Sequence, residues 1–160
     1  MPGCWDDPDN PVNYVGRGVY YGAAVSDAAE CTGEDVYIVG GANSAGQAAM
    51  FMSKAAKSVT LLVRGPSLEA SMSYYLIQQI EATPNIHVRT CTEVVGVIGE
   101  DDHLVGLTLE NKRTGERDEV RSSRMCCFIG ATPRTDWLDG VVARDDHGFI
   151  LAGPDMRDVC

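Results

Sequence analysis

Short apolar runs alternate with helix-like segments from residue 36 onward. Residues 36–39 and 59–63 are apolar and largely β-branched, which is typical of strands buried on both faces of a parallel sheet. The Ala- and Met-rich stretch between them, residues 43–56, predicts a helix with Asn43 or Ser44 as its N-cap. Strand, helix and strand in this order predict a right-handed βαβ unit.

A second helix and a series of strands follow this unit. The helix is predicted over residues 67–82, before Pro84. Its buried stripe should repeat every four residues, with a tyrosine alongside: Leu68, Met72, Tyr75, Leu76 and Ile80. Further strands are predicted at residues 86–90, 93–98, 104–109, 116–120 and 124–129. Polar turns at residues 100–102 and 111–115 predict antiparallel hairpins in the middle of this series.

The order of elements predicts an α/β fold, a Rossmann-like three-layer domain with a parallel central sheet and an inserted antiparallel β-meander. Residues 1–33 are rich in turn-forming residues and predict an irregular lead-in without a strand. Residues 34–133 form the predicted domain. Residues 134–160 are predicted to be connecting chain with one small strand at 148–151.

Charge and length narrow the function classes. The 160 residues carry 13 Lys and Arg against 23 Asp and Glu, for a net charge of −10. This argues against nucleic acid and anionic membranes as partners, because both require clustered positive charge. No run approaches the ~20 apolar residues of a membrane helix. The start of the chain has neither the basic flank nor the apolar core of a secretion signal, so we expect a cytoplasmic protein.

The six cysteines do not form a recognisable motif. No two have the C-x-x-C spacing of a zinc ribbon or of a dithiol redox site. We expect reduced thiols packed as small apolar side chains, with Cys126 and Cys127 on opposite faces of their strand. His87 and Cys91 share one face of a predicted strand but lack the second pair of ligands that zinc needs. The sequence predicts neither a metal site nor catalytic residues.

The junction between the first strand and the first helix carries the most specific motif. Residues 40–45 approach the dinucleotide fingerprint G-x-G-x-x-G/A, with alanine in place of the middle glycine. In that fingerprint a tight turn and the N–H groups at the helix start hold a pyrophosphate. The predicted pyrophosphate-binding residues are Gly40, Gly41, Ala42, Asn43, Ser44 and Ala45. The alternative is an ordinary βα turn of another doubly wound fold.

The end of the second strand bears on the identity of the dinucleotide. An acidic residue there bonds the ribose 2′-hydroxyl of NAD, whereas an arginine accommodates the 2′-phosphate of NADP. Arg64 holds this place, and Ser67 nearby can add a hydroxyl group. The sequence therefore favours NADPH. The alternative is that Arg64 is an ordinary exposed arginine.

Several motifs together resemble the NADPH domain of thioredoxin-reductase-like flavoproteins. They are GGANSAGQAA, VTLLVRG, SYYLIQQIEATPNIHVRTCTEVVGV, FIGATPRTDWL and DDHGFILAG, and the lead-in YVGRGVYYGAA resembles the crossover from the FAD domain. The resemblance implies an NADPH domain inserted in a split FAD domain, with electrons passing from NADPH through FAD to a disulfide or another acceptor. It implies that Gly130 and Ala131 line the cofactor and that Arg64 holds the 2′-phosphate.

The sequence departs from this family in three respects. Residues 22–26 read GAAVS where the redox C-x-x-C is expected, so the resemblance points to a branch without the dithiol. Gly65 and Glu69 stand where further arginines are expected, which leaves NADH open as the cofactor. Both halves of the FAD domain are absent, and residues 1–33 and 134–160 would connect to them.

We therefore expect a fragment that binds NAD(P)H and is inactive on its own, because the FAD domain that would accept the hydride is missing. The sequence leaves the acceptor of the whole enzyme open, with a redox protein as one candidate, and a homodimer is compatible with the resemblance. The rival hypothesis is a non-catalytic dinucleotide-binding module with a regulatory or scaffolding role. Alanine at the middle glycine position and the loss of the C-x-x-C favour that rival.

Overall fold

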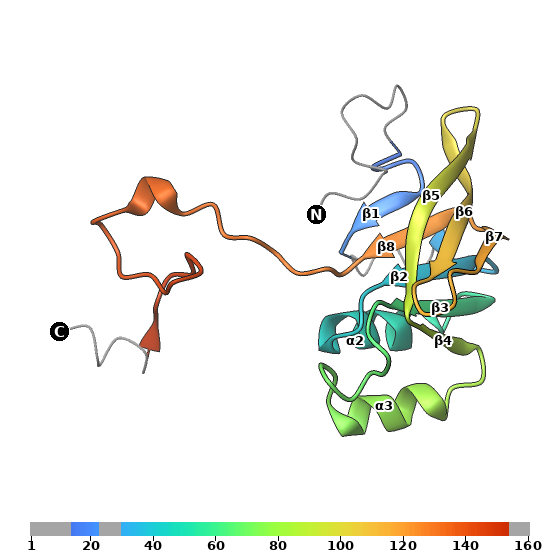
Figure 1. Cartoon of the computed structure of the whole chain (residues 1–160), viewed down its shortest axis with the longest axis horizontal. Coiled ribbons are helices and arrows are strands. Elements are labelled where there is room, and N and C mark those ends of the chain that lie inside the picture. Colours follow the sequence, from blue (N-terminus) through green and yellow to red (C-terminus); the bar gives the residue numbers. More distant parts are fainter. Residues whose placement is uncertain (1–13, 23–29, 154–160) are drawn as a thin grey trace. The chain divides into compact units, whose positions relative to one another are not determined.

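The computed structural model describes residues 14–22 and 30–153 of the chain. They belong to two units, Met1–Ile129 and Gly130–Cys160, which are described separately below. The first unit contains a five-stranded parallel sheet and a three-stranded antiparallel sheet (Figure 1). The parallel sheet has the order β1 (Val19–Tyr21), β8 (Arg124–Cys127), β2 (Asp35–Val39), β3 (Ser58–Val63) and β4 (Ile86–Thr90).

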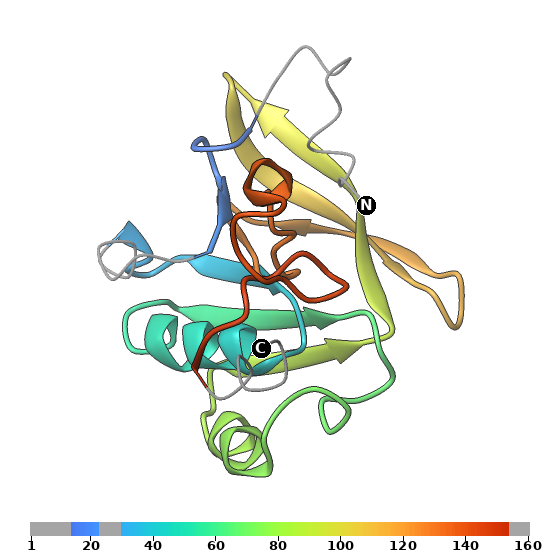
Figure 2. The same ribbon diagram turned by 90° about the vertical axis from the view of Figure 1, so that its left-hand side faces the viewer.

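Two helices lie on one side of the parallel sheet, and the antiparallel strands lie on the other (Figure 2). Helix α2 (Asn43–Met52) connects β2 to β3, and helix α3 (Tyr74–Glu81) connects β3 to β4. The predicted Rossmann-like α/β fold with an inserted meander is therefore confirmed. The N-cap of α2 is Ala42, not Asn43 or Ser44 as predicted, and its backbone is extended with φ −97° and ψ 177°.

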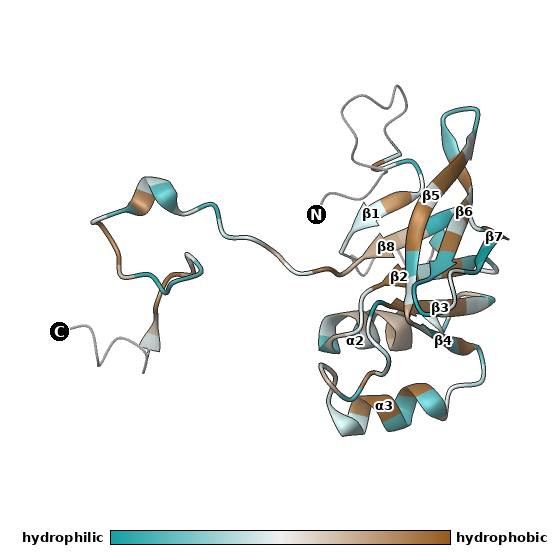
Figure 3. Ribbon diagram, in the orientation of Figure 1, coloured by the Kyte–Doolittle hydropathy of each residue, from teal (hydrophilic) through white to brown (hydrophobic). Residues whose placement is uncertain are grey.

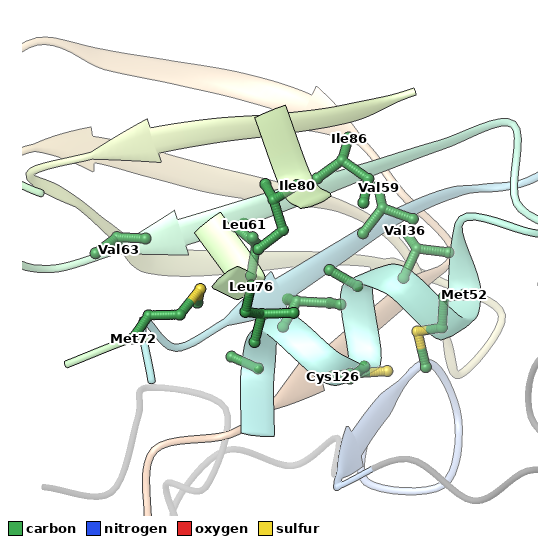
Figure 4. Close-up of a cluster of buried hydrophobic side chains, with 14 of the residues drawn as sticks. Val36, Met52, Val59, Leu61, Val63, Met72, Leu76, Ile80, Ile86 and Cys126 are labelled. Carbon is green, nitrogen blue, oxygen red and sulfur yellow. The ribbon is translucent and has the colours of Figure 1, made fainter. Parts of the chain in front are cut away.

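The hydrophobic core on the helix side explains why α2 is rich in alanine. Ala45 and Ala49 are fully buried, and such small side chains let the helix approach the sheet closely. They belong to a cluster with side chains from the sheet, from both helices and from the segment before α3. Figure 4 labels Val36, Met52, Val59, Leu61, Val63, Met72, Leu76, Ile80, Ile86 and Cys126 of this cluster. Runs of apolar residues in β2 and β3 are required because both faces of the sheet are covered.

Helix α3 is shorter than predicted and begins at Tyr74 instead of residue 67. Residues 68–72 form turns, in which the N–H groups of Ser71 and Met72 donate to the carbonyl oxygen of Leu68 at 3.1 and 2.9 Å. Leu68 and Met72 are nevertheless buried as predicted. Tyr75, placed alongside the buried stripe, is 69% exposed, and Ile77 is buried instead.

The antiparallel sheet consists of β5 (Thr92–Glu100), β6 (His103–Asn111) and β7 (Arg117–Arg121). Figure 3 shows apolar residues along β5 and β6, and buried Leu104, Leu107 and Leu109 pack against the parallel sheet. The predicted hairpins are confirmed by the β5–β6 and β6–β7 pairings. Cys126 lies in the cluster on the helix side and Cys127 in the cluster on the meander side, as their alternation along β8 predicts.

Both ends of the first unit differ from the predictions. Residues 19–21 form a strand where irregular chain was predicted, because three residues are too few to show a period. Val19 is fully buried, and β1 pairs in parallel with β8. Strand β8 ends at Cys127, although the apolar sequence continues to Ile129.

The second unit contains the 3₁₀ turn η1 (Asp136–Leu138). The strand predicted at residues 148–151 is only an isolated bridge between Arg144 and Ile150. None of its described residues is buried, and Trp137 is 78% exposed. In the described portion of the whole chain, no helix has the length and apolar character needed to span a membrane.

Candidate functional site

The predicted glycine loop lies at the carboxyl edge of the parallel sheet. Val39 of β2 pairs with Leu62 of β3 and with Cys127 of β8, so these three strands end side by side. The loop after β2 and Arg64 after β3 therefore start from the same edge. In open α/β sheets, ligands bind in the crevice outside this edge.

Gly40 turns the chain sharply out of β2. Its N–H still donates to the carbonyl oxygen of Leu62 at 3.0 Å, which continues the strand pairing. Its φ of +149° is one that residues with a side chain rarely adopt. A Cβ atom at Gly40 would lie 2.6 Å from the carbonyl oxygen of Phe128. The tight turn therefore requires glycine at position 40, both for its backbone conformation and for its distance from Phe128.

The next two residues bring the chain to the start of α2. A Cβ atom at Gly41 would lie 2.8 Å from Cγ1 of Val63, so a side chain there would displace the end of β3. Ala42 is exposed, and its carbonyl oxygen accepts the first helical hydrogen bond from Gly46 at 3.1 Å. The methyl group of Ala42 thus occupies the place of the middle fingerprint glycine without strain.

The start of α2 is open within the described part of the structure. Asn43 and Ser44 are exposed, whereas Ala45 is fully buried under the helix. No side chain caps the helix and its first turn has no acidic residue. The N–H groups and the positive end of the helix dipole are therefore available to an anion.

The segment that precedes α3 contacts the glycine loop, a feature the sequence did not predict. The Ser71 hydroxyl donates to the carbonyl oxygen of Gly41, and the Ser73 N–H donates to Oδ1 of Asn43, both at 2.8 Å. The signal was the pair of serines at 71 and 73 inside a predicted helix, because serine side chains often bond to nearby backbone instead of supporting a helix.

Arg64 directly follows β3 and is exposed. Its guanidinium group makes no hydrogen bond or ion pair with the described residues. Ser67 is half-buried and its hydroxyl hydrogen-bonds the carboxylate of Glu69, which holds the pKa of Glu69 below its ordinary value. Ser67 is thus engaged by a carboxylate, and Arg64 supplies the cationic group of this loop.

The remaining predicted site residues, Gly130 and Ala131, open the second unit and are exposed. Gly130 has a φ of +91°. The first unit thus brings the end of the 64–73 segment against the loop 40–45, and Arg64 starts from the same edge of the sheet. The position of Gly130 and Ala131 at the cofactor stays a prediction. Residues 23–26, where the redox C-x-x-C was expected, lie outside the described residues.

The structure also bears on His87 and Cys91, which the sequence placed on one strand face. Within the described ranges, no group of three or more His, Cys, Asp or Glu side chains could hold a metal ion. Cys91 does not share a strand with His87, because β4 ends at Thr90 and Cys91 adopts a left-handed φ of 52°. His87 is exposed.

Comparisons with known proteins show the family and the fold of the chain. The family model described as pyridine nucleotide-disulphide oxidoreductase matches residues 13–160. A thioredoxin reductase of Streptomyces clavuligerus is 36% identical over 142 residues, which cover 85% of this chain and 43% of that protein. A thioredoxin reductase of Mycolicibacterium smegmatis is 32% identical over 134 residues, 81% of this chain and 42% of that protein.

Solved structures show the same fold. A thioredoxin reductase from Streptococcus pyogenes superposes with a TM-score of 0.77 and 27% identity, covering 90% of this chain and 46% of that one. The Lactococcus lactis thioredoxin reductase gives a TM-score of 0.78 at 24% identity, with the same two coverages. The chain spans less than half the length of each of these relatives.

Proposed function

The chain belongs to the pyridine nucleotide-disulphide oxidoreductase family, and on that basis we propose that its first unit is the NAD(P)H-binding domain of a thioredoxin-reductase-like flavoprotein. The observation that carries this proposal is the open start of α2 behind Gly40, at the edge where β2, β3 and β8 end. The diphosphate of the dinucleotide would lie against the backbone N–H groups of residues 41–45.

The adenosine end of the dinucleotide is proposed to extend toward Arg64. A guanidinium without a protein partner in the described structure suits a 2′-phosphate, which supports NADPH. The Glu69 carboxylate near Ser67 disfavours a second negative group nearby. NADH therefore remains the competing cofactor. Gly130 and Ala131 are proposed to lie under the adenosine and nicotinamide side of the cofactor.

FAD is proposed to bind mainly outside this chain. The described residues form one parallel sheet with one glycine loop, and this loop is assigned to NAD(P)H. A flavin, when bound, accepts hydride from the reduced nicotinamide and passes electrons on. The residues of this chain bind and orient the dinucleotide. A redox protein is proposed as one candidate for the final acceptor. A cytoplasmic location and a homodimer remain predictions.

Binding of the two dinucleotides to the chain tests the proposal directly. Calorimetric titration of NADPH and NADH should give saturable binding of at least one of them. Arg64→Ala should weaken NADPH about tenfold or more and leave NADH nearly unchanged, since only NADPH has the 2′-phosphate. Arg121→Ala is the matched control, because Arg121 is exposed at the end of β7. The hydroxyl of the next residue, Ser122, donates to the carbonyl oxygen of Asp35, at the opposite end of β2 from the glycine loop. Absence of binding by both dinucleotides would refute the proposal.

A non-catalytic dinucleotide-binding module is the second candidate function. Ala42 at the middle glycine position and Glu69 beside Ser67 support it, because both reduce the fit to a catalytic NADPH site. The gene sequence that flanks these 160 residues separates the two candidates. Flavin-domain sequence on both sides supports the oxidoreductase, and start and stop codons at both ends support the module.

A further inference from the structure

Three consecutive residues ahead of α3 hold the glycine loop and the start of α2. The Ser71 hydroxyl bonds the carbonyl oxygen of Gly41, and the Ser73 N–H bonds the side-chain oxygen of Asn43. Met72 lies between them and is 5% exposed. It packs so closely on α2 that a Cβ atom at Gly46 would lie 2.8 Å from its Cε atom.

The Ser71 contact fixes the orientation of one peptide group. The carbonyl of Gly41 and the N–H of Ala42 belong to the same planar unit and point in opposite directions. Gly41 has no side chain to limit rotation of this unit. When the Ser71 hydroxyl holds the carbonyl oxygen at 2.8 Å, the direction of the Ala42 N–H is therefore set as well.

The Ala42 N–H is at the head of α2. It makes no hydrogen bond with the described residues, so its direction matters only for a ligand or for solvent. A peptide group that is already oriented loses no rotational freedom when the ligand binds, and this improves affinity.

We propose that Ser71 is a positioning residue for dinucleotide binding, because its hydroxyl orients the Gly41–Ala42 peptide toward the diphosphate. This inference rests on the proposed function. In this role Ser71 acts through the Gly41–Ala42 peptide and need not contact the ligand itself. The same segment would then serve both ends of the adenosine diphosphate, with Arg64 at the 2′-phosphate and Ser71 behind the pyrophosphate loop.

Calorimetric titration of Ser71 variants with NADPH and with NADH tests this role. Ser71→Ala should raise the Kd of both dinucleotides by the same factor, about threefold to tenfold, since both share the diphosphate. Ser71→Thr keeps the hydroxyl at an exposed position and should restore an affinity near that of the original chain. Ser53→Ala is the matched control, because the Ser53 hydroxyl also donates to a carbonyl oxygen, that of Met50 at 3.0 Å, at the other end of α2.

The outcomes separate this inference from the proposed function. If the original chain binds neither dinucleotide, the proposed function fails. If it binds them and Ser71→Ala binds equally well, only the role of Ser71 is overturned. The same conclusion follows if Ser71→Thr is as weak as Ser71→Ala, or if Ser53→Ala is equally weakened. Thermal unfolding of each variant shows that it folds.

Discussion

Arg89 and Asp118 connect the two sheets of the first unit through a bidentate ion pair. Nη1 of Arg89 lies 2.9 Å from Oδ2 of Asp118, and Nη2 lies 2.8 Å from Oδ1. Arg89 belongs to β4 at one edge of the parallel sheet, and Asp118 belongs to β7 at one edge of the antiparallel sheet. Parallel geometry of this kind is the most favourable for arginine and carboxylate, although both side chains are partly exposed.

Replacement of Asp118 by asparagine should lower the free energy of unfolding by about 1 kcal/mol, in the range of partly exposed ion pairs. The hydrogen bond from Arg89 holds the pKa of Asp118 below its ordinary value of 3.8. The stabilisation is therefore fully present above that value and is lost as the pH falls through the lowered pKa. Urea unfolding of both proteins from about pH 7 to pH 3 should show a difference that narrows below about pH 4. A difference constant over this range would contradict the assignment.

Gly40→Ala should destabilise the first unit by about 1–3 kcal/mol, since alanine is strained at a positive φ. The new Cβ atom would also press on the carbonyl oxygen of Phe128. Binding of NADPH and NADH should be lost with it. Gly65→Ala is the control for stability, because a Cβ atom there would meet only the Ser67 carbonyl oxygen, at 3.7 Å. Thermal unfolding and calorimetry measure the two effects.

Ala42→Gly should strengthen the binding of both dinucleotides by about threefold, because a glycine at this place lets the backbone approach a pyrophosphate more closely. The helix should tolerate the change, since glycine is acceptable at an N-cap. Ala82→Gly, at the C-cap of α3, is the matched control and should leave affinity unchanged. A weaker affinity in Ala42→Gly would place the diphosphate elsewhere.

Leu61→Ala should cost about 2–5 kcal/mol of unfolding free energy, because Leu61 is fully buried in the cluster under the helices. Val88→Ala, on the same sheet but 38% exposed, should cost much less. Equal losses from urea unfolding would show that the helices do not cover β3 as described.

The sequence correctly predicted those strands and helices that show a clear hydrophobic pattern of their own. An uninterrupted apolar run such as residues 59–63 is typical of a strand buried on both faces. The predicted bounds of β2 and β3 therefore differ from the observed bounds by at most one residue. Strand β1 was missed because its three residues are held by pairing with β8, far along the chain. The start of α3 was missed because Ser71 and Ser73 bond the glycine loop, an interaction between segments that periodicity does not reveal.

The candidate site was predicted in part for the same reason. Gly40 is needed by local backbone geometry, which a motif records directly. The engagement of Ser67 by Glu69 depends on side-chain orientation in a loop, which has no pattern of its own. The observed N-cap is Ala42 and not the predicted Asn43 or Ser44, because a residue with extended backbone can precede a helix without a capping side chain.

Strand order has a consequence for how this chain is synthesised. Within the sheet, β1 has only β8 as a neighbour, and β8 separates it from β2. On the ribosome, β1 can therefore pair within the sheet only after β8 has emerged. Until then β2 presents an open edge, and such long-range closure is slow. A nascent chain halted before residue 124 would leave β1 without its partner and one edge of β2 unpaired, so the risk of aggregation is greatest before β8 emerges.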